Sequence, residues 1–378
     1  MSGLTETIVR LAHLPPSPHP LISCFLNTKP DGRGRPTHPV FLKKAFAERL
    51  RSFPDRAEAR ADIEADRNRL LAYLEEEIEP SVQSVAVYAS RRDDLWEALT
   101  FRTTFEQHRL VIGPVPHLYP LVKLADQAPL YAVCVADSDQ ARIVVCGLGE
   151  VLTQEDFEAP QPIDRTRVAG WAEVRYQSRI EDHIHKNARE IVERLTEIVT
   201  RREVDYVILA GDEFILGELR KSLTPAIREK LIEEERIPIE ASAQEILART
   251  ISVVRKTEAA DSRRLADTVV DRFRAGGLAV AGLGATIEAL NQEQVDQLLL
   301  AERFDGRPGW QCPQCRVLGQ PPRPAACPFC GAPLPEEIDL REAMVRRAER
   351  TGRRVEIVES HPELEALDGV GALLRYRA

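Results

Sequence analysis

Short apolar runs bounded by polar turn residues dominate the first part of the chain and predict a mixture of strands and helices. Residues 21–26 and 84–88 are apolar runs of the kind found in buried strands. The charged stretch 57–79 has apolar residues near helical spacing and predicts a long helix. A loop containing glycine, proline and arginine is expected over 29–39. We therefore expect residues 1–125 to form an N-terminal α+β domain.

Strand and helix patterns alternate in the rest of the chain and predict α/β architecture for a middle domain, 126–258, and a C-terminal domain, 259–378. The elements expected in the middle domain are strands at 130–137, 141–148 and 204–211, the first two forming a hairpin, and helices at 172–202, at 218–235 with a break at Pro225, and from 241 past 255. The elements expected in the C-terminal domain are helices at 261–275, 285–290 and 340–350, and strands at 278–282, 295–300, 355–360 and in the terminal GVGALLRY.

An insert rich in proline, glycine and cysteine, residues 306–335, interrupts the C-terminal pattern and carries two C-x-x-C pairs separated by eleven residues. Each pair forms a turn whose thiolates meet one ion, and two such knuckles complete a tetrahedral site of four sulfurs. Gly331 suits a positive φ after the second pair. We predict a structural Zn²⁺ site, with an iron–sulfur cluster or a redox dithiol as alternatives. The predicted ligands are Cys312, Cys315, Cys327 and Cys330.

Four thiolates on Zn²⁺ leave a local charge that nearby arginines, Arg307, Arg316 and Arg323, are expected to offset. Two roles for the insert remain open. It is either a staple that folds a segment with few apolar residues or a lobe that contacts RNA or protein.

Composition restricts the class of protein. Apolar residues make up 43% of the 378 residues, enough for ordinary cores, while a net charge of −9 means that any RNA contact needs local basic patches. The sequence has no apolar run of membrane-spanning length and no secretory signal pattern, so we expect a cytoplasmic protein with no membrane partner. Cys24, Cys134 and Cys146 lie in apolar runs and are expected to be buried thiols.

Three stretches, taken in order along the chain, carry a family resemblance. They are YAVCVADSDQARIVVCGLGEV followed by a basic loop and the helix WAEVRYQSRIEDHIHKNAREIVERL, then AGGLAVAGLGATIEALNQEQVDQLLL before the cysteine insert, and the terminal GVGALLRY. Together they resemble the archaeo-eukaryotic peptide-chain release factor superfamily, which includes Pelota. The resemblance is closer to its bacterial branch, which includes ribosome hibernation factors of this shape.

The resemblance implies a ribonuclease-H-like middle domain and a C-terminal domain similar to a kink-turn-binding ribosomal protein, with the zinc ribbon inserted. It also implies a tRNA-sized protein that enters the ribosomal A site. The N-terminal domain would then approach the decoding centre and the middle-domain loop, 164–176, the peptidyl-transferase centre. Ribosomal RNA is the expected partner, a translational GTPase is a further candidate, and DNA is not expected.

The loop departs from the family pattern where release factors carry Gly-Gly-Gln. This chain has Ala169-Gly170-Trp171, and an indole offers one N–H donor and no acceptor with which to place a water. The Asn-Ile-Lys-Ser motif of stop-codon reading is also absent. We therefore expect no catalytic residue of this type and a ribosome-bound factor for hibernation, a stalling response or rescue. A peptidyl-tRNA or RNA hydrolase that uses Gln177 or a histidine is the alternative.

Two basic patches are candidate RNA contacts. Arginine pairs with phosphate, and Trp171 and Tyr176 can stack on bases. For both patches a solvated face with intrahelical ion pairs remains an alternative. The middle-domain candidates are Arg165, Arg167, Gly170, Trp171, Arg175 and Arg179, and the N-terminal candidates are Lys29, Arg33, Arg35, Lys43 and Lys44.

Other candidate groups have simpler interpretations. His183 and His185 are two apart on an expected helix, so they face different sides and make a poor metal pair. Gly282-Leu283-Gly284 is expected to be a structural turn rather than a dinucleotide loop, since the third small position is isoleucine. Turn or cap roles are favoured over a nuclease site for three carboxylates near strand ends, Asp137, Asp205 and Asp212.

Overall fold

The computed structural model describes residues 3–51, 57–158, 171–333 and 335–377, with side chains from residue 183 onward in the helix that begins at Trp171. The chain is a mixed α/β protein with two compact units. Ala128–Glu258 form the middle unit, while Gly3–Gln127 and Ala259–Ala378 together form the second unit. Among the described residues, no helix has both the length and the apolar character needed to span a membrane.

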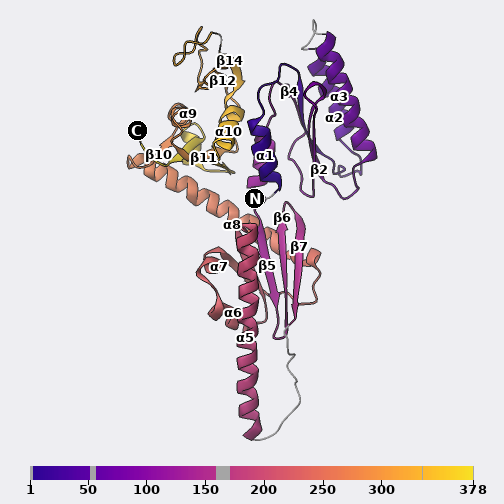
Figure 1. Cartoon of the computed structure of the whole chain (residues 1–378), viewed down its shortest axis with the longest axis vertical. Coiled ribbons are helices and arrows are strands. Elements are labelled where there is room, and N and C mark those ends of the chain that lie inside the picture. The colour runs from indigo at the N-terminus through magenta and orange to yellow at the C-terminus, as the bar shows by residue number, and fades with distance from the viewer. Residues whose placement is uncertain (1–2, 52–56, 159–170, 334, 378) are drawn as a thin grey trace. The chain divides into compact units, whose positions relative to one another are not determined.

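The middle unit is built on a five-stranded sheet with the order β7-β6-β5-β8-β9, part of which is visible in Figure 1. The first three strands form an antiparallel meander, which confirms the predicted hairpin, and β8 and β9 continue the sheet in parallel. The strands are β5 (Tyr131–Ala136), β6 (Gln140–Gly147), β7 (Glu150–Glu158), β8 (Tyr206–Gly211) and β9 (Leu231–Glu235).

Alternation along the central strand β5 separates two cores, because successive side chains of a strand point to opposite faces. Cys134 packs on one face with α5 (Trp171–Arg202), α6 (Glu213–Ser222) and α7 (Pro225–Lys230). Val133 packs on the other face with α8 (Ala243–Arg274). Burial raises the pKa of the Cys134 thiol to about 12, as expected for a thiol that acts as a small apolar side chain.

One helix prediction in this part of the chain is wrong, and two predicted helices form one continuous helix. Residues 231–235, predicted as helix, form β9, an edge strand whose exposed or half-buried glutamates need no apolar cover. The helices predicted at 241–255 and 261–275 are the single helix α8, since no glycine or proline interrupts 243–274. The boundary between the two compact units therefore falls within one helix.

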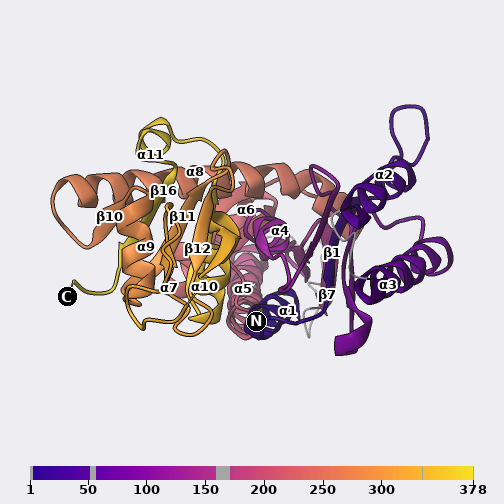
Figure 2. The ribbon, with the colours of Figure 1, turned by 90° about the horizontal axis from the view of Figure 1, so that it is seen from above.

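In the second unit, residues 3–127 contain an antiparallel sheet with the order β3-β2-β1-β4. Its predicted strands and its long helix are confirmed. Figure 2 shows α2 and α3 side by side, and both pack on the face that carries Ile22, Cys24 and Leu26. The elements are α1 (Gly3–His13), β1 (Leu21–Asn27), α2 (His38–Leu50), α3 (Ala57–Glu76), β2 (Ser84–Ser90), η1 (Arg91–Asp93), β3 (Leu95–Phe101), β4 (Arg109–Gly113) and α4 (Tyr119–Asp126).

Residues 259–377 add a four-stranded sheet with the order β10-β16-β11-β15, and the predicted strands and helices outside the insert are present. Two short strands of the cysteine insert, β12 and β13, and β14 directly after it form a separate sheet with the order β13-β12-β14. The elements are β10 (Ala279–Ala281), α9 (Leu283–Asn291), β11 (Val295–Ala301), β12 (Pro308–Gln311), β13 (Leu318–Gly319), β14 (Glu336–Asp339), α10 (Leu340–Arg350), β15 (Arg354–Val358), α11 (Pro362–Ala366) and β16 (Val370–Leu374).

Helix α10 joins the two parts of the second unit by packing on α1 and α4. The carboxylate of Glu342 accepts hydrogen bonds from the backbone N–H groups of Leu118 and Tyr119, at 2.7 and 3.0 Å. These amides lie at the start of α4, where backbone donors lack partners within the helix. Glu342 is only 8% exposed, so this carboxylate is a buried cap supplied by a distant part of the chain.

Candidate metal centre and candidate RNA-contacting residues

The four cysteines of the insert converge on one point. Their sulfur atoms all lie within 4.8 Å of one another, with Cys312 Sγ 3.5 Å from Cys330 Sγ and Cys315 Sγ 3.6 Å from Cys327 Sγ. A disulfide needs sulfurs only ~2 Å apart, whereas a tetrahedral ion with ~2.3 Å metal–sulfur bonds holds them ~3.8 Å apart. The four thiols are therefore spaced for a shared metal ion and not for disulfides.

The two knuckles have the same backbone geometry. In the first, Cys312 N–H donates to Val317 O and Arg316 N–H donates to Cys312 O. In the second, Cys327 N–H donates to Ala332 O and Gly331 N–H donates to Cys327 O. The residue after each pair is left-handed, with φ of 62° at Arg316 and 74° at Gly331. The predicted positive φ at Gly331 is confirmed, and the same turn at Arg316 places a non-glycine residue in a conformation it rarely adopts.

Contacts of Trp310, Gly319 and Asn291 hold the segment that carries the knuckles. Trp310 Nε1 donates to Gln320 O at 2.8 Å, and its ring lies where a Cβ on Gly319 would come within 2.2 Å, so only glycine fits there. Asn291 of α9 forms two hydrogen bonds with the backbone of Leu318, at 2.9 and 3.0 Å. These contacts tie the knuckles to the adjacent α/β layer.

Charge around the sulfurs differs in one respect from the sequence expectation. Arg307 forms an ion pair with Asp368 at 3.0 Å, so its charge is already balanced and the idea that it offsets the thiolates is not supported. Arg316 belongs to the first knuckle itself, and Arg323 lies exposed in the segment between the knuckles. The expectation that these two arginines offset the thiolate charge stays a prediction.

The N-terminal basic candidates are exposed, as an RNA contact would require. Lys29, Arg33 and Arg35 lie in the loop between β1 and α2, and Lys43 and Lys44 lie on α2. The Asp31 carboxylate accepts hydrogen bonds from the backbone N–H groups of Arg33 and Arg35, at 2.8 and 2.9 Å. These bonds order the loop backbone while both guanidinium groups face solvent.

The middle-domain candidates cannot be placed in the same way. Arg165, Arg167 and Gly170 lie outside the described residues. Trp171 begins helix α5, and Arg175 and Arg179 follow on its backbone, with no side chain described. The prediction that this segment contacts RNA therefore stays a prediction.

The other candidate groups have structural roles. The Asp137 carboxylate accepts from the backbone N–H groups of Asp139 and Gln140, both at 2.8 Å, and Asp212 caps the N-terminus of α6. Asp205 accepts from Leu130 N–H at 3.0 Å, and His185 Nδ1 lies 3.2 Å from Glu218. Gly282 is the left-handed turn before α9, with φ of 91°. The turn and cap predictions are confirmed for Asp137, Asp212 and Gly282, whereas Asp205 bonds a backbone amide 75 residues away, a contact that is neither a turn nor a cap.

Comparisons with known proteins find a family match that covers most of the middle unit. Residues 116–255 match the model of bacterial archaeo-eukaryotic release factor family 10. The uncharacterized protein Rv2629 of Mycobacterium tuberculosis is 23% identical over 276 residues, which are 71% of this chain and 71% of that protein. Peptide chain release factor subunit 1 of Thermoplasma acidophilum is 29% identical over 177 residues, which are 44% of this chain and 36% of that protein.

Among the solved structures similar over nearly the whole length is a chain from a model of ribosome-bound archaeal Pelota and ABCE1. It has 14% identity, coverage of 99% of this chain and 94% of that chain, and a TM-score of 0.44.

Proposed function

We propose that this chain, which belongs to the superfamily of archaeo-eukaryotic release factors and Pelota, acts as a ribosome-associated translation factor. It would bind ribosomal RNA in the A site, in hibernation, a stalling response or rescue, without hydrolysis dependent on Gly-Gly-Gln. The observation that carries the proposal is the family match over 116–255, which includes the segment where Trp171 stands in the glutamine position. A translational GTPase is a candidate partner.

The proposal assigns domains as 1–125, 126–258 and 259–378. The strand order β7-β6-β5-β8-β9, with three antiparallel and two parallel strands, supports a ribonuclease-H-like middle domain. The mixed sheet of residues 279–374 supports a C-terminal domain similar to a kink-turn-binding ribosomal protein. We assign the metal as structural Zn²⁺, because four thiolates in tetrahedral spacing leave no open coordination position.

RNA binding is assigned to the two arginine-rich segments. In the N-terminal segment, Arg33 and Arg35 project from an ordered turn, and Lys43 and Lys44 are exposed on the following helix. Such a local patch can bind phosphates although the chain as a whole is acidic. The middle-domain segment is assigned by its place in the family pattern and by its residues.

Co-sedimentation with purified ribosomes in sucrose gradients tests the proposal. Binding should weaken steeply as salt rises, because each phosphate contact releases condensed counterions. Arg33→Gln with Arg35→Gln should shift much of the protein to the top fractions, and Arg165→Gln with Arg167→Gln should do the same. A matched control is Arg272→Gln with Arg303→Gln, which removes the same charge from exposed sites elsewhere. A protein that stays at the top in low salt, or variants that sediment like the control, would contradict the assignment.

The hydrolase alternative gains no support from the described residues. His185 is already paired with Glu218, and Gln177 lies within the helix α5 rather than at the loop tip. Release of labelled peptide from peptidyl-tRNA on stalled ribosomes separates the two functions. The proposal expects binding without turnover.

A further inference from the structure

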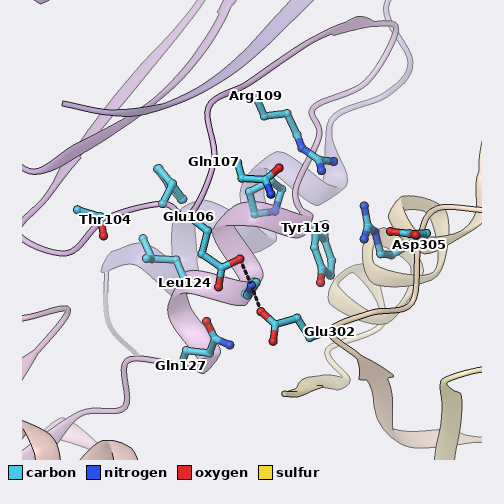
Figure 3. A pocket seen from close by; sticks show the side chains of 13 residues that line it. Thr104, Glu106, Gln107, Arg109, Tyr119, Leu124, Gln127, Glu302 and Asp305 are labelled. Atoms are coloured by element: carbon cyan, nitrogen blue, oxygen red, sulfur yellow. Dashed lines mark hydrogen bonds and ion pairs between the residues drawn. The ribbon is translucent and has the colours of Figure 1, made fainter. Parts of the chain in front are cut away.

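The second unit contains a polar cavity that the proposed ribosome contacts do not use. Its volume is about 210 Å³, and residues of the segment 104–127 line it together with residues near the end of β11 and the start of α10. Figure 3 shows charged side chains of the segment 104–127 and of residues after the end of β11 around the cavity. Its charged lining residues are Arg109, Lys123, Arg341, Glu106, Glu302 and Asp305.

One of the three cations is already neutralised. The Lys123 ammonium lies 2.7 Å from a carboxylate oxygen of Glu106 and also forms an ion pair with Glu302. In Figure 3 these contacts lie on one side of Tyr119, and Arg109 and Asp305 lie on other sides of that ring. Lys123 therefore offsets one of these two carboxylates, and the charged lining groups without an ion pair among the described residues are two guanidinium groups and one carboxylate.

Arg109 is held in place by a chain of buried hydrogen bonds. Its Nη1 lies 3.2 Å from His117 Nε2, and His117 Nδ1 lies 3.1 Å from Glu342 Oε2. Because a guanidinium only donates, Nε2 accepts, and the ring proton on Nδ1 faces the carboxylate. Burial lowers the pKa of His117, which agrees with this neutral form. Glu342 is in turn fixed by the backbone of α4.

Arg341 is the second fixed cation. It is only 7% exposed, its Nη1 donates to Phe304 O at 3.0 Å, and its guanidinium carbon lies 4.1 Å from the centre of the Tyr119 ring. Its Nε is buried and has no hydrogen-bond partner among the described residues. Within the same described part of the chain, neither Arg341 nor Arg109 has a carboxylate within ion-pair distance. Burial, followed by the charge of Arg341, lowers the pKa of Arg109.

Two immobilised guanidinium groups that repel each other in one cavity are suited to an anion. Guanidinium donors match phosphate oxygens in planar, paired geometry, and holding them rigid beforehand reduces the entropy lost on binding. The cavity is small compared with those that enclose drug-sized ligands. We propose that Arg109 and Arg341 bind the phosphate group of a small phosphorylated ligand, with Asp305 as an acceptor for a hydroxyl or amine elsewhere on it.

Isothermal titration calorimetry of the full chain, with inorganic phosphate, AMP and adenosine as probes, tests this site. Phosphate and AMP should bind saturably, and adenosine, which lacks only the phosphate, should not. Arg341→Gln should weaken AMP binding by about tenfold or more, as expected for loss of a charge-assisted contact. The control Arg303→Gln removes an equal charge from an exposed neighbouring position and should leave affinity within about twofold.

A second variant keeps the test decisive if Arg341→Gln fails to fold. Asp305→Asn removes a negative charge from the lining without touching either arginine, so it should tighten binding of inorganic phosphate about twofold to threefold. Absence of saturable binding by both phosphate and AMP would overturn the proposal. Equal affinity in the wild type and Arg341→Gln would do so as well. Binding of a 5′-phosphorylated oligoribonucleotide with no binding of either small probe would replace the small ligand by RNA.

Discussion

The cysteine cluster and the Glu342 network both hold polar groups inside the second unit, but over different lengths of chain. The cluster draws its four sulfurs from residues 312–330, within one insert. The network joins Glu342 to Leu118, a partner 224 residues away in the chain. A local cluster can be dismantled without opening the sheets around it, whereas a long-range cap is shared by both parts of the unit. We therefore expect the cluster to stabilise one lobe and the network to stabilise the unit.

Removing the metal site should have the largest effect on stability. That effect should be confined to the lobe formed by residues 308–339. Cys327→Ser with Cys330→Ser leaves two ligands, and structural zinc sites contribute about 10 kcal/mol or more to folding of their modules. We expect loss of bound metal and fast amide exchange over 308–339, with β11 and β15 still protected. Metal analysis and hydrogen-exchange mass spectrometry measure both. Cys134→Ala, which removes a buried thiol elsewhere, should retain the metal.

Removing the buried cap should have the next largest effect, spread over the whole second unit. Glu342→Ala leaves the amides of Leu118 and Tyr119 without an acceptor and should cost about 3 kcal/mol in free energy of unfolding. Urea denaturation measures the loss in free energy of unfolding. Hydrogen exchange of the backbone amides in α1, α4 and α10 shows how far the destabilisation spreads. Glu342→Gln retains one acceptor oxygen and should cost less. Faster exchange limited to α10 would mean that the network is as local as the cluster.

The network should also make the stability of the second unit depend on pH through His117. Burial lowers the pKa of His117 in the folded state below its unfolded value of about 6.5. The unfolded chain then binds the extra proton first, so stability falls as pH drops below about 6.5. Urea midpoints between pH 7.5 and 5.5 should fall less in His117→Gln than in the wild type. The exposed His13→Gln should follow the wild type.

The smallest expected effect lies within the cluster, where the two knuckles differ at one position. Arg316 has φ of 62°, which costs a side-chain-bearing residue about 1 kcal/mol, while Gly331 adopts 74° without strain. Arg316→Gly should therefore tighten metal binding by about threefold to fivefold, and Gly331→Ala should weaken it by a similar factor. Competition with a chromophoric chelator measures both. Weaker metal binding in Arg316→Gly would contradict this expectation and show that loss of the arginine side chain outweighs the relief of backbone strain.

Local patterns explain why much of the fold was predictable. The strands at 131–136, 206–211 and 295–301 are apolar runs, and the spacing of the four cysteines predicts a metal site. Helix α2 was not predicted, although Leu42, Phe46 and Leu50 repeat every four residues on its buried side. The glycine and proline residues directly before this repeat predict a loop, and the repeat itself spans only three apolar positions. Helix α8 was divided in two because a domain boundary was expected at 258–259, where the helix is continuous.

The arginine cavity could not have been predicted in the same way. Arg109 follows a phenylalanine-containing turn, and Arg341 lies in a charged helix, so each resembles an ordinary surface residue in sequence. Burial of Arg341 depends on Tyr119 and Phe304, which come from the two separate chain segments of the second unit. No periodicity or motif in the sequence predicts that these residues come together, because their contact arises from the packing of α10 on α4. The cavity is a product of tertiary structure alone.

The cap supplied by Glu342 also affects the order in which the molecule can mature during its own synthesis. Tyr119 is translated 223 residues before the carboxylate that its amide requires. At roughly 5–20 residues per second, the early segment waits about ten to fifty seconds for its partner. During that interval the faces of α1 and α4 that α10 will cover remain accessible to chaperones. Completion of the second unit therefore waits until α10 has been synthesised.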